Sequence, residues 1–368
     1  MTLGVLQLSA ILGWKKMKSK SSPEHPLRAG KVAPELLAHL LPSATEAPDI
    51  QVGPNVGEDA AVVAGEDVMV VTADPVTFAT SDIGRYAVAV NCNDLVAMGA
   101  VPRFFTATLL LPLGTTRSAL SHIFNQLDRA TAAAGVAWIG GHTEITDAVR
   151  VPVVAGSAIG SLAGEQPWSS SNAQVGDRVV ATKWMGLEGS TLLARERAAL
   201  CRQLGLPVDR MQAWLTNPGI DIVAEGRALA GLPLHAAHDP TEGGFAQGLH
   251  EIAACSGVRI ELQAENLPLR EETAVLCRGL DIDPMGLLAS GSLLFAAPAE
   301  IANEALRNLK AASIPAVQIG HVAQGAGVVV HEAGRAHDVP TFVQDEVVKV
   351  LRVGKGYRRY GSSLSIIL

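Results

Sequence analysis

The stretch NCNDLVAMGA (residues 91–100) decides how we expect this chain to fold. Its apolar residues predict a helix over about residues 82–98 that ends at Gly99. Asn91 and Asp94 are three residues apart, so they share one face of that helix. A buried carboxylate is costly without a partner, and a buried Asp94 would therefore need a cation or metal. A polar stripe on an exposed helix face is the alternative, and the sequence leaves both open.

Outward from this helix, short apolar runs separated by glycine and proline predict alternating strands and helices. In the first half we expect strands over residues 60–63, 68–72, 104–111, 136–139 and 151–159, and a helix over 116–135. In the second half we expect strands over 178–182, 258–262, 290–297, 317–321 and 327–330, and helices from about 186 and over 219–230, 243–255 and 299–312. The order predicts an α/β (α+β) chain with a poorly ordered extension, two domains and a tail, over residues 1–28, 29–165, 172–345 and 346–368.

Composition excludes several classes of function. The 368 residues are 48% apolar and 18% charged, with a net charge of −7. Nucleic-acid binding is not expected, because phosphate contacts need basic surface and the dense basic clusters lie only at the two ends. The four cysteines are widely spaced, which argues against a zinc site or a disulfide framework. Without a run of about 20 apolar residues or a signal-peptide pattern, we expect a cytoplasmic protein with no membrane span.

Two acidic motifs precede the helix. In GEDAAVV (57–63), a glycine and adjacent carboxylates lead into a strand. Such a loop can direct carboxylate oxygens to Mg²⁺ and backbone amides to phosphate. In TADP (72–75), Asp74 follows an apolar strand, where ligands collect in α/β folds. An ordinary turn is the alternative for each motif.

Two further motifs come later in the chain. GGHTE (140–144) follows a predicted strand, and its paired glycines would let the backbone approach a ligand, with His142 and Glu144 adding titratable groups. HDPTEGG (238–244) precedes a predicted helix, whose N-terminus favours anions. A hydrogen-bonded loop histidine and a simple helix cap at Thr241 are the alternatives.

No single motif is specific, but the set is. The sequence contains neither a P-loop nor a G-x-S-x-G turn. Five acid- and glycine-containing segments at the ends of predicted elements together indicate a site that binds polyanions through metal ions.

In their order along the chain, these motifs resemble the superfamily of aminoimidazole ribonucleotide (AIR) synthase, the hydrogenase maturation factor HypE, selenophosphate synthetase and thiamine-monophosphate kinase. The match covers about residues 29–335. TKWMGLEG (182–189) and DPMGLLASG (283–291) are most similar to HypE-like, AIR-synthase-related proteins. The resemblance implies a two-domain PurM-like fold and a homodimer whose N-terminal strands pair into a shared barrel. It also implies ATP held with Mg²⁺ between the domains and across the dimer.

The resemblance also implies roles for individual residues. The residues expected to act in catalysis are Lys183, Asp94 and His142. Of these, Lys183 would be the basic group beside the transferred phosphate. The expected metal ligands are Asp59, Asp74, Asp94 and Asp239. The expected ATP-binding residues are Asn91, Asn93, Gly141, Glu144, Asp239 and Glu242.

The implied activity is activation of a carbonyl-type oxygen by phosphoryl transfer from ATP to an unidentified small-molecule or protein-borne acceptor. The sequence departs from hydrogenase maturation factors at two points. It ends in GSSLSIIL (361–368), without the terminal cysteine that carries their thiocarboxamide, and His142 stands where those relatives often have Asp. The alternatives are a thiamine-monophosphate kinase-like phosphotransferase and a non-catalytic ATP-binding scaffold for a maturation partner.

Overall fold

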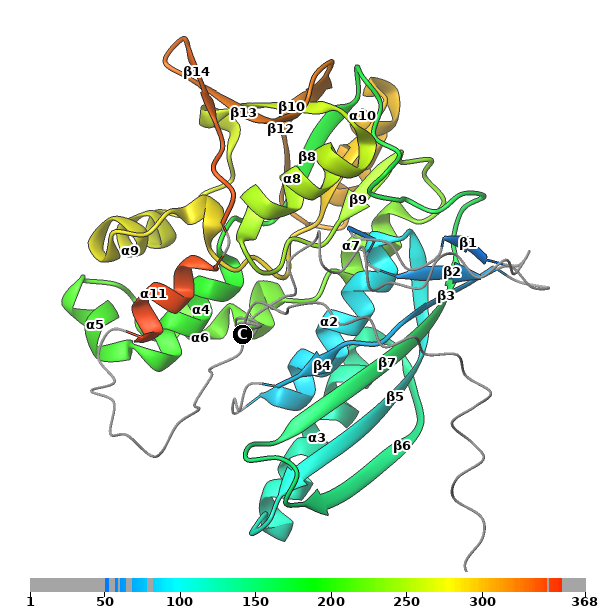
Figure 1. Cartoon of the computed structure of the whole chain (residues 1–368), viewed down its shortest axis with the longest axis vertical. Helices are drawn as coiled ribbons and strands as arrows, with labels where there is room; N and C mark the ends of the chain where they lie inside the picture. The colour runs from blue at the N-terminus through cyan, green and yellow to red at the C-terminus, as the bar shows by residue number, and fades with distance from the viewer. Residues whose placement is uncertain are drawn as a thin grey trace, which may run out of the picture.

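The computed structural model describes residues 50–52, 57–58, 60–63, 68–77, 82–342 and 344–352, so the predictions for residues 1–28 and for Asp59 lie outside it. The described residues form two seven-stranded mixed sheets, each with its own helices (Figure 1). Within the described part of the chain, no helix is long and apolar enough to cross a membrane.

The first sheet lies in the lower half of Figure 1 and packs one face on two helices. Its strands are β1 (Ile50–Val52), β2 (Ala61–Val63), β3 (Met69–Thr72), β4 (Pro75–Val76), β5 (Ala100–Pro112), β6 (Ala137–Thr146) and β7 (Val153–Leu162). Their order is β1-β2-β3-β7-β5-β6, with β4 also paired to β7. The helices are α2 (Ile83–Ala97) and α3 (Arg117–Ala134).

The second sheet lies in the upper half of Figure 1. Its strands, in the order β14-β13-β10-β12-β8-β11-β9, are β8 (Arg178–Thr182), β9 (Ala236–His238), β10 (Arg259–Gln263), β11 (Leu294–Ala297), β12 (Ala316–Ala323), β13 (Gly327–Glu332) and β14 (Arg335–Asp338). The helices are α4 (Leu187–Glu196), α5 (Ala198–Gln203), α6 (Val208–Ala213), α7 (Val223–Leu229), α8 (Gly244–Ser256), α9 (Glu271–Leu280), α10 (Ala299–Ala311) and α11 (Glu346–Arg352). Short helical turns cover Leu215–Gly219, Ala264–Asn266 and Pro284–Gly286.

The predicted helix around residue 91 is α2, and its apolar side chains form the centre of the first core. Tyr86, Cys92 and Leu95 are buried against the helix-facing side chains of β5, including Phe105 and Leu109. Since side chains alternate between the faces of a strand, β5 turns Thr106, Thr108 and Leu110 to the opposite face, where they are only half-buried. The first sheet is therefore packed on one face and partly open on the other.

The two domains meet at α2. The side-chain amide of Asn93 donates from Nδ2 to the carbonyl of Ile220 (3.0 Å) and accepts from the backbone N–H of Ile222 (2.9 Å) at Oδ1. Helix α2 also contacts α7 and β9 of the second domain. Both groups of the Asn93 amide therefore join the domains.

Two predictions are corrected by the structure. The GGHTE motif was expected to follow a strand, but β6 runs through it to Thr146, because Gly140 and Gly141 allow a bulge beside β5. A Cβ at Gly141 would lie 1.9 Å from the carbonyl oxygen of Ala107. In addition, residues 346–352, expected to belong to a tail, form α11, whose Val347 is fully buried in a core with α4 and α6.

Candidate functional site

The polar face of α2 holds the end of β3. Asn91 accepts the backbone N–H of Asp74 at Oδ1 (2.9 Å) and donates from Nδ2 to the carbonyl of Asp74 (3.1 Å). One turn further along, Asp94 accepts the hydroxyl of Thr72 at Oδ2 (2.7 Å). Asn91 is fully buried and Asp94 is 9% exposed, so the exposed-stripe alternative is wrong. The structure therefore brings Asn91, Asp74 and Asp94 together at the end of β3.

The two carboxylates at the end of β3, Asp74 and Asp94, differ in solvent exposure. Asp74 is exposed, whereas Asp94 lies at the buried side of the same strand end. Oxygen-only donors suit Mg²⁺, which is usually bound by one or two carboxylates together with phosphates and water. Among the described residues, no three His, Cys, Asp or Glu side chains could hold a metal ion by themselves. The donor set therefore fits Mg²⁺ delivered with phosphate rather than a metal caged by protein alone.

The acidic motif of the second domain lies beside α2 as well, at the interface between the two domains, which we call the joint. Asp239 directly follows β9, which lies against α2, and it is 2% exposed. Glu242 is half-buried in the loop before α8. The backbone N–H of Gly243 donates to Oδ2 of Asp345 at 2.9 Å, and Asp345 precedes α11. The C-terminal helix therefore fixes the loop that carries Glu242.

Lys183 is at the joint, but its ammonium already has partners. Nζ lies 2.9 Å from Oε1 of Glu225 and donates to the carbonyl of Asp221 at 2.7 Å. Lys183 is 6% exposed, and Glu225 is fully buried. Burial raises the pKa of Glu225, while the nearby ammonium of Lys183 acts to lower it. The role of Lys183 beside a phosphate stays a prediction, and the structure adds its buried ion pair.

Sequence reasoning missed two buried carboxylates beside this loop. Burial raises the pKa of Glu188 to about 7, with Asp345 and Glu242 adding to the shift and a hydrogen bond from Ser290 opposing it. Burial likewise raises the pKa of Asp345 to about 6. The Glu of TKWMGLEG was the available signal for Glu188. Asp345 gave none, because only the fold brings it to Gly243.

His142, Glu144 and Gly141 lie elsewhere, on the outermost strand β6. Nε2 of His142 is 3.6 Å from Oε2 of Glu144, and their side chains are 64% and 52% exposed. Strands β5 and β7 separate β6 from β4, which at about 4.8 Å per strand places this pair roughly 14 Å from the end of β3. Within one chain, these residues are therefore not brought to Asp94.

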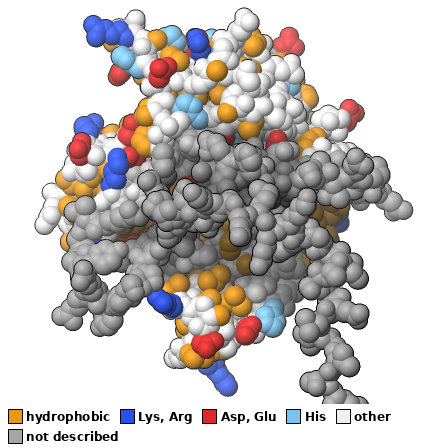
Figure 2. Space-filling model, in the orientation of Figure 1, with side chains coloured by type: hydrophobic (Ala, Val, Ile, Leu, Met, Phe, Trp, Pro, Cys, Tyr) orange, Lys and Arg blue, Asp and Glu red, His pale blue; other side chains and the backbone are white. Residues whose placement is uncertain are grey.

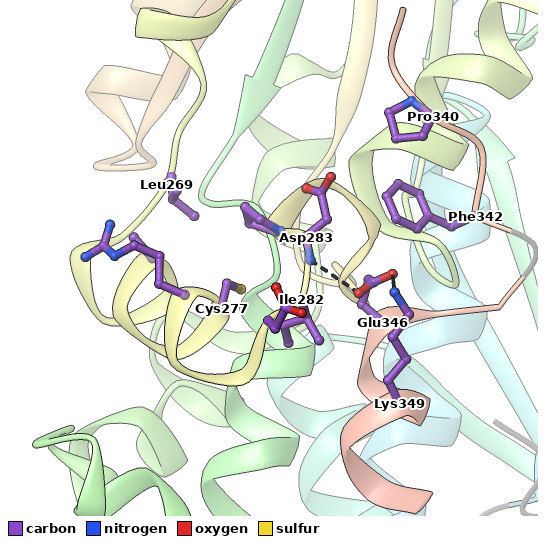
Figure 3. A pocket seen from close by; sticks show the side chains of 12 residues that line it. Leu269, Cys277, Ile282, Asp283, Pro340, Phe342, Glu346 and Lys349 are labelled. Carbon is purple, nitrogen blue, oxygen red and sulfur yellow. Dashed lines mark hydrogen bonds and ion pairs between the residues drawn. The ribbon is translucent and has the colours of Figure 1, made fainter. Parts of the chain in front are cut away.

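An open pocket in the second domain is a separate feature (Figure 3). Its volume is about 740 Å³, and it is lined by Leu269, Ala274, Cys277, Arg278, Asp281, Ile282, Asp283, Pro284, Pro340, Phe342, Glu346 and Lys349. Glu346 accepts the backbone N–H of Asp283 and pairs with Lys349. None of the residues predicted to bind ATP or metal lines this pocket.

Family comparisons agree with the two-domain arrangement. The family model "AIR synthase related protein, N-terminal domain" matches residues 57–162, and the C-terminal domain of the same family matches residues 174–332. Together they cover both sheets except for strands β1 and β14. The chain belongs to the AIR synthase-related family.

Members of this family named HypE are similar to this chain in sequence and fold. Carbamoyl dehydratase HypE of Rhodobacter capsulatus is 32% identical over 62% of this chain and 66% of its own length. The match thus spans about two thirds of that relative. A crystal structure of a HypE–HypF complex matches 77% of this chain and 93% of the solved chain, with 27% identity and a TM-score of 0.67. A HypE structure in complex with ATP matches 85% of this chain and 91% of the solved chain, with 23% identity and a TM-score of 0.63. This match shows the shared fold.

Proposed function

We propose that this member of the AIR synthase-related family is an ATP- and Mg²⁺-dependent enzyme that activates a carbonyl-type oxygen by phosphoryl transfer. One observation carries the proposal: α2 gathers Asp74 and Asp94 at the joint where Asp239 enters from the second domain. The relatives support it, because one is named carbamoyl dehydratase and another HypE is solved with ATP.

In this proposal, some residues of the joint bind the metal ion and others hold those ligands in position. Asp74 and Asp94 would hold Mg²⁺, which when bound supplies the positive charge that neutralises the phosphates. Asn91 keeps the backbone of Asp74 in place, and the hydroxyl of Thr72 orients Asp94. Asp239 closes the site from the other domain, next to the N-terminus of α8, where backbone N–H groups favour anions.

We also propose that the working unit is a homodimer. Strand β6 is the outermost strand of its sheet and leaves Ile139 and Ile145 57% and 47% exposed. Long exposed edge strands attract further pairing, and exposed apolar patches mark interfaces. Figure 2 shows hydrophobic side chains gathered where Figure 1 places β5, β6 and β7. A second copy on this face would bring His142 and Glu144 to an ATP site that one chain leaves without them.

The acceptor is best sought on a separate molecule. Burial raises the pKa of Cys92 and of Cys277 to about 12 and also raises that of Cys201, which makes these three thiols poor nucleophiles. Two relatives support a protein-borne acceptor with a carbamoyl-type group: a HypE solved in complex with the protein HypF, and a HypE named carbamoyl dehydratase.

An assay of ADP release tests the enzyme proposal. Wild-type protein is expected to release ADP from Mg-ATP slowly by itself and faster with an acceptor, whereas Asp94→Asn is not. Asn172→Ala, an exposed position in the segment between the domains, is the matched control. Rapid phosphorylation of thiamine monophosphate would support the kinase alternative instead. ATP binding without turnover under every acceptor tested would support the scaffold alternative.

A further inference from the structure

The segment between the two sheets contains two adjacent buried serines. Ser169 and Ser170 are 2% and 1% exposed, although segments that connect domains normally run over the surface. Buried hydroxyls need hydrogen-bond partners. The partners of these two lie in different domains.

Ser169 bonds to the first domain. Its Oγ donates to Oε1 of Glu58 at 2.5 Å, lies 2.6 Å from Oγ of Ser171 and accepts the backbone N–H of Ser171 at 3.2 Å. Glu58 belongs to the GED motif. The preceding residue, Gly57, lies directly on α8, because a Cβ there would be 2.4 Å from Sγ of Cys255 and its φ is +88°. Gly57 therefore packs on α8 of the second domain, and Ser169 holds the neighbouring Glu58.

Ser170 bonds to the second domain. Its Oγ lies 3.2 Å from Nδ1 of His238 and 3.2 Å from the carbonyl oxygen of Ala237. Nε2 of the same imidazole is 2.8 Å from Oε2 of Glu251. An ionised carboxylate only accepts, so Nε2 carries a proton there. His238 directly precedes Asp239, and Ser170 therefore holds the strand end that carries the second acidic motif.

The backbone of the segment is fixed as well. The hydroxyl of Ser256 donates to the carbonyl of Ser170 at 2.8 Å and accepts the backbone N–H of Ala173 at 3.0 Å. The Ser170–His238–Glu251 array does not function as a nucleophile, because its serine hydroxyl is buried. Its rigidity suits a positioning role.

We propose that Ser169 and Ser170 are positioning residues that couple the two acidic motifs across the domains. The hydroxyl of the first holds Glu58, and the hydroxyl of the next holds His238. Because Ser169 and Ser170 are neighbours in the chain, with Cα atoms about 3.8 Å apart, we expect a backbone shift at one residue to displace the other. The effect on ATP rests on the proposed function, whereas the coupling itself is a property of the chain without ligand.

Hydrogen exchange without ATP tests the coupling. Ser169→Val and Ser169→Thr are nearly equal in shape, and only threonine retains the hydroxyl. Loss of one buried hydrogen bond is expected to raise the amide exchange rates of both residues 60–63 and residues 236–244 about tenfold in Ser169→Val, but not in Ser169→Thr. Ser170→Val and Ser170→Thr are expected to behave in the same way. If each valine variant loosens only its own partner segment, the two serines act independently and the proposal is wrong.

Titration with Mg-ATP gives the functional readout. Each valine variant is expected to weaken the Kd for ATP about tenfold, and the double variant no more than either single one, since the pair acts as a unit. Fully additive losses would contradict the coupling. Asn172→Ala is expected to change neither exchange nor affinity. If the wild type does not bind Mg-ATP, the proposed function fails, and the exchange rates alone decide the coupling. Alanine variants replace any valine variant whose melting shows that it is unfolded.

Discussion

The residues predicted to form the ATP site lie in two regions, one at α2 and one on β6, and only those at α2 contact one another within the interior of the chain. At α2, polar residues from the strand end and the helix meet within one chain, and Asp94 is nearly buried. On β6, His142 and Glu144 have similar chemistry, but both are more than half exposed, and strands β5 and β7 lie between them and β3. Under the proposed function, the chain itself builds the buried half of the site, and we expect the exposed half to be completed by a second copy.

Replacing the buried carboxylate is expected to have the largest effect. Asp94→Asn keeps the shape and a hydrogen-bond acceptor for Thr72 but removes the charge that would hold Mg²⁺. Turnover of Mg-ATP is expected to fall by about 100-fold or more, with the dimer intact. The checks are ADP release and sedimentation. Wild-type turnover in this variant would remove Asp94 from the site.

Breaking the ion pair between Lys183 and Glu225 is expected to have the second-largest effect. Lys183→Met leaves Glu225 buried without its cation and is expected to lower the free energy of unfolding by about 3 to 5 kcal/mol. The double variant Lys183→Met with Glu225→Met is expected to recover much of this loss. Denaturant unfolding measures both. Equal stability of the single variant and the wild type would contradict a buried pair.

Glu188 gives a pH-dependent effect of similar or smaller size. Its pKa of about 7 in the folded chain is above the ordinary glutamate value of 4.5, so the folded state retains the proton more strongly. Stability therefore falls as pH rises from about 4.5 to 7, by roughly 3 kcal/mol. Glu188→Gln is expected to be more stable than the wild type by that amount at pH 8 and equal to it near pH 4.5. Parallel stability curves across this range would show that Glu188 is not buried as a titrating acid.

The exposed half is expected to give the smallest change in the stability of one chain. His142→Ala and Glu144→Gln remove exposed groups, so the free energy of unfolding is expected to change by less than about 0.5 kcal/mol. If β6 forms the dimer face, Ile139→Asp is expected to produce monomers that bind ATP more weakly. If sedimentation shows the wild-type protein to be monomeric at all concentrations, β6 does not form a dimer face and the exposed residues do not complete an ATP site.

How much could be predicted from the sequence differed between these regions. The helix α2, with Asn91 and Asp94 on one face, followed from local spacing, and the structure confirms it. The path of β6 did not, because paired glycines indicate a turn until the backbone of Ala107 is seen beside Gly141. The contacts of Ser169 with Glu58 and of Asp345 with Gly243 join residues more than 100 positions apart, for which local patterns carry no signal.

The most direct test of the central claim is isothermal titration of the chain with ATP, with and without Mg²⁺, for the wild type and Asp94→Asn. The joint at α2 predicts binding by the wild type that depends on Mg²⁺ and is strongly weakened in the variant. Absence of ATP binding, or equal binding by both proteins with and without Mg²⁺, would contradict the assignment of Asp74, Asp94 and Asp239 to a metal-assisted ATP site.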